Sequence, residues 1–289
     1  MEGWNARLDR SEAVWVLDED PDLGRGVDSK RRGELQARAV APLLRLAPGE
    51  SDLARLVRTD ENDLGALVLD GLLARNVVVA RGRFTELLGT GDLLRPRDDL
   101  TDPKSLRANV NWAVMEPTRL ALLDHRFARR IAPWLPAIAA VLLERTVQRA
   151  RWLTLRTAIN ETRRIDERLL LLLCHLADRW GRIELDGTCL PLRLTHEVLG
   201  RMVGAHRSSV TTALNRLLEK GSLSRNAQGL LVLDGAAPVG FAGTRAPSHA
   251  QRGAAALSQA EFDGDLHSTF CPRELGRQRR YSFSAVAGL

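Results

Sequence analysis

Residues 195–221 constrain the fold more than any other stretch of the 289-residue chain. They read THEVLGRMVGAHRSSVTTALNRLLEKG, with apolar side chains at helical spacing before and after a break at Gly204. Thr195 is a favourable N-cap because its hydroxyl accepts a backbone hydrogen bond from the first turn. We predict one helix over 196–203 and a second from Arg207 to Gly221. Two short helices joined by a few residues that include glycine form a helix-turn-helix.

Gly200 supports the pairing of these two helices. A glycine inside a helix costs about 1 kcal/mol relative to alanine, so a structural reason is expected. Close approach of the second helix is that reason, with Val210 filling the space between the helices. The next residues, SLSRNAQGLLVLDG, hold two short apolar pieces around a polar turn and predict a β-hairpin wing. A helical hairpin that only packs is the alternative, but it explains neither the two glycines nor the wing.

The outward face of the second predicted helix is polar and lacks carboxylates. It holds Arg207, Ser208, Thr211, Thr212 and Asn215, with Ser209 beside them. Arginine donates paired hydrogen bonds to guanine, and Ser and Thr hydroxyls bond to base edges or phosphates. The net charge of +6 and the pI near 10.0 favour a polyanionic partner. We therefore predict that this helix enters the major groove of double-stranded DNA, and that Arg225 of the wing reaches the backbone.

The part of the chain before the motif divides into three predicted segments. Residues 1–33 are charged and predict a flexible lead-in with little regular structure. Residues 34–130 hold short apolar stretches between turn residues, which predict several short strands in a β-sandwich or roll. The glycines of this segment are expected at its turns: Gly71, Gly82, Gly89 and Gly91.

A long helix is predicted after Pro136, to about Asn160, within the segment 131–160. One face carries residues at spacings of three and four or their sums: Ile138, Val141, Leu142, Arg145, Trp152, Leu155 and Ile159. Part of this stripe must pack on its own domain, and the rest can form a seam with a second copy, although Arg145 and Gln148 interrupt it. We expect a homodimer. A second helix over 161–181 opens the domain 161–234, and residues 235–289 predict a disordered tail.

Cysteine usage and the chain start bear on location and cofactors. Cys174, Cys189 and Cys271 are too widely spaced for a disulfide framework or a metal site, so no metal and no cofactor is expected. The start has no signal-peptide core, and the longest apolar run, 169–174, is too short to span a bilayer. The sequence predicts a cytoplasmic protein without a membrane partner. His175 is predicted to be a packed core histidine with its hydrogen bonds satisfied.

The stretch LTHEVLGRMVGAHRSSVTTALNRLLEKGSL resembles the winged helix of the Crp/Fnr family of bacterial transcription regulators. The upstream LGALVLDGLLARNVVVARGRFTELLGTGDLLRP resembles that family's β-roll, with GTGDLL at its usual turn, and helix 137–160 resembles its dimerisation helix. The resemblance implies an α+β fold: an N-terminal, jelly-roll-like β-roll sensor domain, a long dimerisation helix and a C-terminal winged helix-turn-helix. It also implies a homodimer on two-fold symmetric DNA, with RNA polymerase as a further partner.

The resemblance assigns roles by position in the winged helix. It implies phosphate contacts from Thr195, His196 and Ser209, and a base contact from Arg207. Ser208 and Thr212 stand where the best-known members have Glu and Arg, so their operator sequence does not transfer.

The predicted roll departs further from the family pattern. The Gly-Glu-Leu and Arg-Ser/Thr-Ala stretches that hold a cyclic nucleotide are absent, so an unknown small-molecule effector other than a cyclic nucleotide is expected. Arg95 and Arg107 are the candidates to replace the missing anion ligand, but a solvated surface arginine is the favoured interpretation of each. No Cys or His precedes His125, which disfavours iron–sulfur, haem and metal sites in the roll.

Two alternatives to an effector-responsive regulator remain. One is a ligand-independent DNA-binding protein whose roll serves only dimerisation or protein contact. The other is a cupin-type enzyme, which is disfavoured because histidine ligands are missing before residue 125. The prediction is therefore a regulator and not an enzyme.

Overall fold

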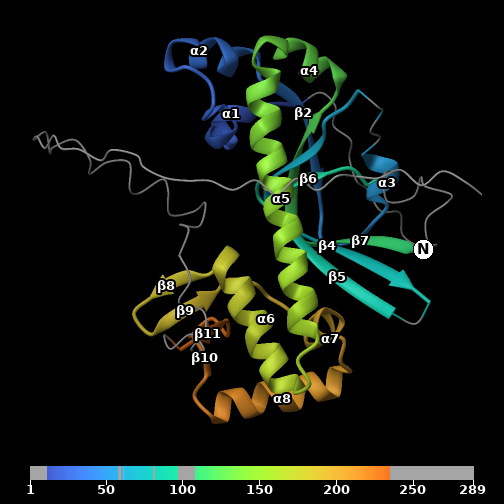
Figure 1. The fold of residues 1–289 in the computed structure, drawn as a ribbon, viewed down its shortest axis with the longest axis vertical. Helices are drawn as coiled ribbons and strands as arrows, with labels where there is room; N and C mark the ends of the chain where they lie inside the picture. The colour runs from blue at the N-terminus through green and yellow to red at the C-terminus, as the bar shows by residue number, and fades with distance from the viewer. Residues whose placement is uncertain (1–11, 58–59, 61, 81, 97–107, 235–289) are drawn as a thin grey trace, which may run out of the picture. The chain divides into compact units, whose positions relative to one another are not determined.

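A seven-stranded antiparallel sheet forms the N-terminal part of the protein in a computed structural model (Figure 1). Its main path is β1–β2–β7–β4–β5, with β3 paired to β7 and β6 paired to β4. The strands are β1 (Ala13–Trp15), β2 (Val40–Leu46), β3 (Gly49–Ser51), β4 (Gly65–Val79), β5 (Gly82–Gly89), β6 (Leu93–Leu94) and β7 (Asn109–Leu123).

The structure describes residues 12–57, 60, 62–80, 82–96 and 108–234. The chain divides into two units, Met1–Gly243 and Thr244–Leu289, and every described residue belongs to the first. The predicted tail 235–289 lies outside the described residues.

The prediction of several short strands is wrong for the centre of the sheet. Strands β4 and β7 each span 15 residues and pair with each other along most of their length. Register shifts bend β4 between Val68 and Leu73. Gly71 lies in this bulged part and not in a turn, because it has a φ of 93° and a Cβ there would lie 2.4 Å from Pro117 O. Gly91, with a φ of 87°, does lie in the predicted GTGD turn.

The prediction of little regular structure over 1–33 is wrong for residues 12–33. This segment contains β1, the helices α1 (Val16–Glu19) and η1 (Pro21–Gly24), and the start of α2 (Ser29–Arg38). Sparse apolar side chains order it, because Val16, Leu23 and Leu35 are almost fully buried in one core cluster. Asp20 adds an ion pair to Arg145, at 2.5 Å.

The long helix predicted after Pro136 is α5 (Leu135–Asn160), preceded by α4 (His125–Arg130) and η3 (Ala132–Trp134). Figure 1 shows α5 running beside the sheet strands. The predicted stripe is mostly its inward face, because Ile138, Val141, Leu142 and Ile159 are buried within the same chain. Leu155 is 51% exposed, so it belongs to the part of the stripe that does not pack within the chain.

The C-terminal part contains the predicted winged helix-turn-helix. Its helices are α6 (Ile165–Trp180), α7 (His196–Val203) and α8 (Arg207–Glu219). The strands β8 (Arg182–Glu184), β9 (Gly187–Leu190), β10 (Leu223–Arg225) and β11 (Leu231–Leu233) form an antiparallel sheet in the order β10–β11–β9–β8. One core cluster joins the three helices to Leu72 and Leu87 of the large sheet.

None of the described helices is long and apolar enough to cross a membrane. Within the same residues, no three His, Cys, Asp or Glu side chains gather as metal ligands.

Candidate nucleic-acid interface

Helix α7 has the predicted bounds, and α8 starts at the predicted Arg207 but ends at Glu219, two residues before the predicted Gly221. The Thr195 hydroxyl accepts a hydrogen bond of 3.2 Å from Val198 N and so caps α7. His206 caps α8, because its Nδ1 accepts from Ser208 N at 3.4 Å and lies 2.8 Å from Ser208 Oγ. Histidine is an uncommon N-cap, so the sequence analysis did not single it out.

Both glycines of the motif have structural roles. A Cβ on Gly200 would lie 2.7 Å from Ala205 O, so the turn itself, more than α8, demands close approach here. Gly204 adopts the left-handed conformation, with a φ of 64°, and ends α7. Val210 is fully buried, as expected for a side chain that packs between the two helices. These positions fix the angle at which α8 leaves α7.

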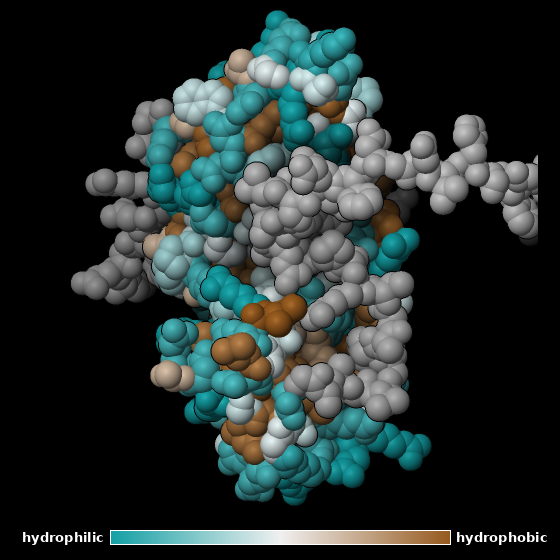
Figure 2. Space-filling view, turned by 90° about the vertical axis from the view of Figure 1, so that its left-hand side faces the viewer, coloured by the Kyte–Doolittle hydropathy of each residue, from teal (hydrophilic) through white to brown (hydrophobic). Residues whose placement is uncertain are grey.

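The predicted contact residues divide by exposure. The exposed ones are Thr195, Arg207, Ser208, Thr212, Asn215 and Arg225, and the half-buried ones are His196, Ser209 and Thr211. The bottom of Figure 2, where α8 lies in Figure 1, is coloured mostly hydrophilic. The structure thus brings the predicted α7 and α8 residues to one polar, solvent-facing region.

Hydrogen bonds order part of this region before any ligand arrives. His196 Nδ1 lies 2.8 Å from Thr211 Oγ1, which links α7 to α8. The Thr211 hydroxyl also donates to Arg207 O at 3.0 Å, and the Thr212 hydroxyl donates to Ser208 O at 3.2 Å. Of the two threonines, only Thr212 is exposed, so it has the freer access to a partner.

The wing holds Arg225 close to its own hairpin. Its Nη1 donates to Gly229 O at 2.8 Å, across the turn between β10 and β11. The Asn226 side chain accepts from Gln228 N and Leu230 N, each at 3.0 Å, and tightens the same turn. A DNA contact from Arg225 therefore requires its guanidinium to exchange or share this bond.

Two arginines that the sequence analysis missed anchor α7. Arg156 of α5 donates to Met202 O at 3.2 Å, and Arg168 of α6 donates to Val203 O at 2.7 Å. Carbonyl groups at a helix C-terminus lack intrahelical partners, so cations there satisfy them and complement the helix dipole. No local sequence signal links these residues, because 46 positions separate Arg156 from Met202 and 35 positions separate Arg168 from Val203.

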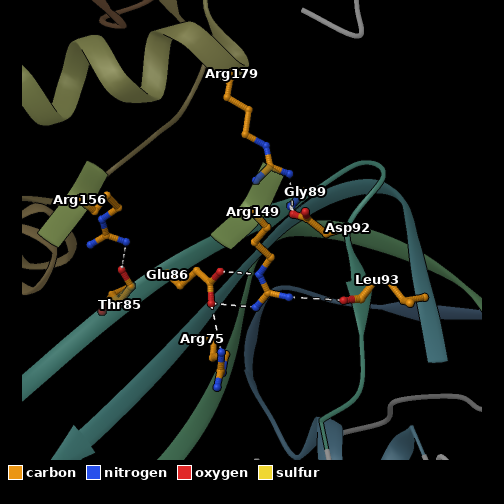
Figure 3. Close-up of polar contacts among 9 residues, drawn as sticks. All are labelled: Arg75, Thr85, Glu86, Gly89, Asp92, Leu93, Arg149, Arg156 and Arg179. Carbon is orange, nitrogen blue, oxygen red and sulfur yellow. Dashed lines mark hydrogen bonds and ion pairs between the residues drawn. The ribbon is translucent and has the colours of Figure 1, made fainter. Parts of the chain in front are cut away.

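The junction between β5 and the helices is also polar (Figure 3). Glu86 accepts two bonds from Arg149, at 2.6 and 2.8 Å, and one from Arg75 at 3.2 Å. Burial alone would raise the pKa of Glu86, but the bonds and charges of Arg149 and Arg75 lower it below its ordinary value. Asp92 of the GTGD turn accepts 2.5 and 2.8 Å bonds from Arg179 and Gly89 N.

His175 lies at this junction and corrects one prediction. It is packed, with 2% of its surface exposed and its ring centroid 4.4 Å from that of Trp152. Its Nε2, however, has no hydrogen-bond partner within the part of the chain that the structure describes, so it is not a satisfied core histidine.

Arg95 and Arg107 are the two arginines considered as replacements for the missing cyclic-nucleotide ligand. Arg95 donates to Asp63 O at 2.5 Å, so its guanidinium takes part in the fold. Arg107 lies outside the described residues.

A part of the chain that contains this interface matches a known domain family. Residues 167–237 match the model of the Crp-like helix-turn-helix domain. A comparison with curated protein sequences found no match.

Solved structures share the fold at low sequence identity. A CooA mutant from Carboxydothermus hydrogenoformans aligns at 20% identity over 80% of this chain and 95% of its own, with a TM-score of 0.51. A cyclic nucleotide-binding domain containing protein from Listeria monocytogenes EGD-e aligns at 15% identity over 74% and 96%, with a TM-score of 0.53. The c-di-GMP responsive global regulator CLP of Xanthomonas campestris aligns at 18% identity over 70% and 99%, with a TM-score of 0.50.

Residues 167–237 thus resemble the Crp-like helix-turn-helix domain, and the chain shares the fold of these solved structures, with an N-terminal β-sheet domain and a long helix before the helix-turn-helix.

Proposed function

We propose that the protein is a sequence-specific DNA-binding transcription regulator that inserts α8 into the major groove. The observation that carries this proposal is the exposed face at the start of α8. Its accessible side chains are Arg207, Ser208, Thr212 and Asn215, and α8 itself contains no carboxylate before its last residue, Glu219. A helix between two phosphate ridges needs donors and no acidic repulsion. Thr195, His196, Ser209 and Thr211 lie beside this face and are proposed to contact phosphate or support those that do.

We propose that the protein binds DNA as a homodimer through α5. The outward side of α5 carries small and apolar residues at alternating spacings of three and four, all exposed: Ala140, Leu143, Val147, Ala150 and Thr154. Leu143 is 63% exposed and Val147 is 43% exposed, unlike the buried inward stripe. This spacing is that of a two-helix seam, so a second copy of the chain would cover both side chains.

Light scattering tests the seam. The double substitution Leu143→Glu and Val147→Glu is expected to give a monomer, because it places carboxylates inside the contact. Gln148→Glu, an exposed change away from the seam, is expected to leave the dimer intact. A wild-type protein that is monomeric at micromolar concentration, with and without DNA, contradicts the homodimer.

Selection of bound duplexes from a random pool, at two salt concentrations, tests the function. We expect a two-fold symmetric motif with half-sites about one helical turn (roughly 34 Å) apart, and binding that weakens steeply with salt. Salt-sensitive binding without any motif would favour an architectural DNA binder instead. Absence of binding at low salt would reject the proposal. RNA polymerase and a small-molecule effector are the expected further partners.

A further inference from the structure

The two histidines of the helix-turn-helix use their ring nitrogens in opposite ways. His196 lies at the start of α7 and His206 directly before α8, at the lower end of the molecule in Figure 1. Each bonds within the motif through Nδ1, and none of the described residues bonds to Nε2 of either ring. A neutral histidine has one hydrogen on its two ring nitrogens, so the bond at Nδ1 determines what Nε2 can offer to a partner.

His206 uses Nδ1 as an acceptor. Ser208 N donates to it at 3.4 Å, and Ser208 Oγ lies 2.8 Å from the same nitrogen. A nitrogen that accepts has no hydrogen, so the hydrogen of the neutral ring is on Nε2. Because His206 is exposed, this Nε2–H is a donor that a partner can reach. Protonation of Nδ1 would remove the cap bond and place a cation at the positive end of the α8 dipole, so the cap depends on the neutral ring.

His196 uses Nδ1 as a donor. Its partner is Thr211 Oγ1, at 2.8 Å, and the same hydroxyl donates to Arg207 O at 3.0 Å. The hydroxyl has a single hydrogen, and the bond to Arg207 O uses it. Both contacts are therefore hydrogen bonds only if His196 Nδ1 donates to Thr211. The hydrogen of the neutral ring is then on Nδ1, and Nε2 presents a lone pair.

Nε2 of His196 keeps contact with solvent, although the residue is half-buried. The buried side-chain atoms without a hydrogen-bond partner among the described residues include Nε2 of His175 but not Nε2 of His196. The first helix of a helix-turn-helix crosses the DNA backbone when the second helix enters the major groove. A group at the start of α7 therefore meets phosphate oxygens, which accept hydrogen bonds and repel the lone pair of a neutral His196.

The chain itself offers no negative partner to a charged His196. Within the described residues, no carboxylate is bonded to this ring, and its neighbour Glu197 pairs with Arg201. The charged groups that face α7 are Glu197 and Arg201 on the helix itself, Arg207 of α8, and, at the other end of α7, Arg168 of α6 and Glu86 of β5. A positive charge on His196 would thus gain its compensation from a DNA phosphate.

We propose that His196 contacts a DNA phosphate only as an imidazolium, so that DNA binding takes up one proton from solvent at each His196. The added hydrogen is on Nε2 and is donated to the phosphate, while Nδ1 keeps its bond to Thr211. His206 donates its own Nε2–H without uptake of a proton. Histidine changes its charge between about pH 5 and 8, so DNA affinity rises as the pH falls through this range. The inference rests on the proposed insertion of α8 into DNA and defines the charge state of one contact.

Ring-nitrogen NMR of the free full chain at about pH 8 tests the two tautomers without DNA. We expect the hydrogen on Nδ1 of His196 and on Nε2 of His206. The spectra of His196→Gln and His206→Asn assign the signals, because each lacks one ring. A free protein in which neutral His196 has its hydrogen on Nε2 overturns the proposal.

Binding of a mixed-sequence duplex to the full chain tests the proton uptake, with ionic strength held constant from about pH 6 to about pH 8. This probe suffices because phosphate contacts do not depend on base sequence. Linkage predicts that affinity falls up to about tenfold per pH unit for each His196 engaged. Binding that does not change with pH rejects this inference alone, whereas absence of binding at every pH rejects the proposed function with it.

Substitutions assign the proton to one residue. His196→Arg has a permanent charge, so it should lose the pH dependence and bind at about pH 8 as tightly as the wild type does at about pH 6. His196→Gln is always neutral, so it should lose the pH dependence and bind weakly throughout. His206→Asn, the matched control, keeps an N-cap side chain and an amide donor, and it should keep the pH dependence. A pH dependence that survives in His196→Gln overturns the assignment.

Thr211→Val tests whether the hydrogen bond to Thr211 imposes the proton uptake. The substitution removes the acceptor for Nδ1 with little change of shape, so a neutral His196 can place its hydrogen on Nε2 and donate it to the phosphate. Thr211 is thus a positioning residue, and we expect a weaker pH dependence, with the relative gain in affinity at the high-pH end. The full wild-type pH dependence in a folded Thr211→Val protein would show that Thr211 does not hold the tautomer and would overturn the proposal.

Discussion

The helix-turn-helix and the β5 junction both present arginines, but their surroundings differ. Arg207 at the start of α8 is exposed, and it is next to hydroxyl groups that bond mainly to their own helix. Arg149 and Arg179 at the junction are partly buried and form ion pairs with Glu86 and Asp92. Exposed donors retain their capacity for a partner that arrives later, whereas paired buried charges are committed to the fold.

The difference has an energetic consequence. An exposed ion pair is worth about 0–1 kcal/mol, because water solvates both charges after the pair is broken. Removing one member of a buried pair costs about 3–5 kcal/mol, because the other charge is left uncompensated. Substitutions at the junction should therefore change the free energy of unfolding, and substitutions on α8 should change DNA affinity.

Glu86→Gln is expected to have the largest effect on stability. It leaves Arg149 and Arg75 without the carboxylate that both contact, so we expect a loss of about 3–5 kcal/mol in chemical denaturation. Glu144→Gln breaks the exposed ion pair with Arg25 and serves as control, with a loss below about 1 kcal/mol. Equal effects of the two substitutions would contradict the contrast between buried and exposed pairs.

The pH dependence of stability gives a second measure of the same carboxylate. Because the folded protein lowers the pKa of Glu86, its contribution is present above the unfolded pKa, near 4.5, and is lost as the pH falls through the folded value. The difference in unfolding free energy between wild type and Glu86→Gln should therefore shrink below pH 4.5. A difference that is constant over this range would show that the Glu86 charge is not responsible.

The helix-turn-helix was predictable because its signals are local. The N-cap Thr195, the helical spacing of apolar residues and the breaking Gly204 lie within one short stretch, and α7 has the predicted bounds. The junction was not predictable, because Glu86 and Arg149 are 63 positions apart and each reads alone as a surface charge. The ion pairs at the junction join residues far apart in the chain, so the hydrophobic periodicity of the sequence does not predict them.

The same distinction explains the errors in the N-terminal part. The few apolar residues among 12–33 give no clear period, yet the core that covers them orders the segment. The stripe on α5 was identified, but the sequence could not separate its inward face from its outward face. Only the packing shows that Ile138 and Val141 are buried within the chain, and that Leu143 and Val147, which lie off the predicted stripe, are exposed.

Gly200→Ala tests whether the turn between α7 and α8 requires a residue without a side chain at position 200. The new Cβ would lie 2.7 Å from Ala205 O, so we expect a loss of about 1–3 kcal/mol and weaker DNA binding as the turn shifts. Gly204→Ala meets no atom but requires a left-handed alanine, at a cost of about 1–2 kcal/mol.

Asparagine distinguishes the two glycines. It tolerates the left-handed conformation, so Gly204→Asn should recover part of the stability that Gly204→Ala loses. Gly200→Asn should be at least as damaging as Gly200→Ala, because the restriction there is steric. Thermal unfolding of the four proteins makes the comparison, and recovery at position 200 would show that the turn can move.

Arg207→Ala should change DNA affinity with little change in stability. The side chain is exposed at the start of α8, so we expect a loss of about 1–3 kcal/mol in specific binding and relaxed preference at one base pair. Arg216→Ala, at an exposed position near the other end of α8, is the matched control and should have a smaller effect. Equal weakening on every DNA sequence would make Arg207 a phosphate contact instead of a base contact.

Thr195 lies on the boundary between the two kinds of residue, because it caps α7 and is also a proposed phosphate contact. Thr195→Ala should remove the bond to Val198 N, cost about 1 kcal/mol of stability and weaken DNA binding. Thr195→Asp keeps a good N-cap but places a negative charge toward the phosphate backbone, so it should preserve stability and reduce affinity more than alanine does. Measuring unfolding and DNA binding on both variants separates the roles. If Thr195→Asp binds DNA as well as the wild type, Thr195 only caps α7, and the DNA backbone passes elsewhere.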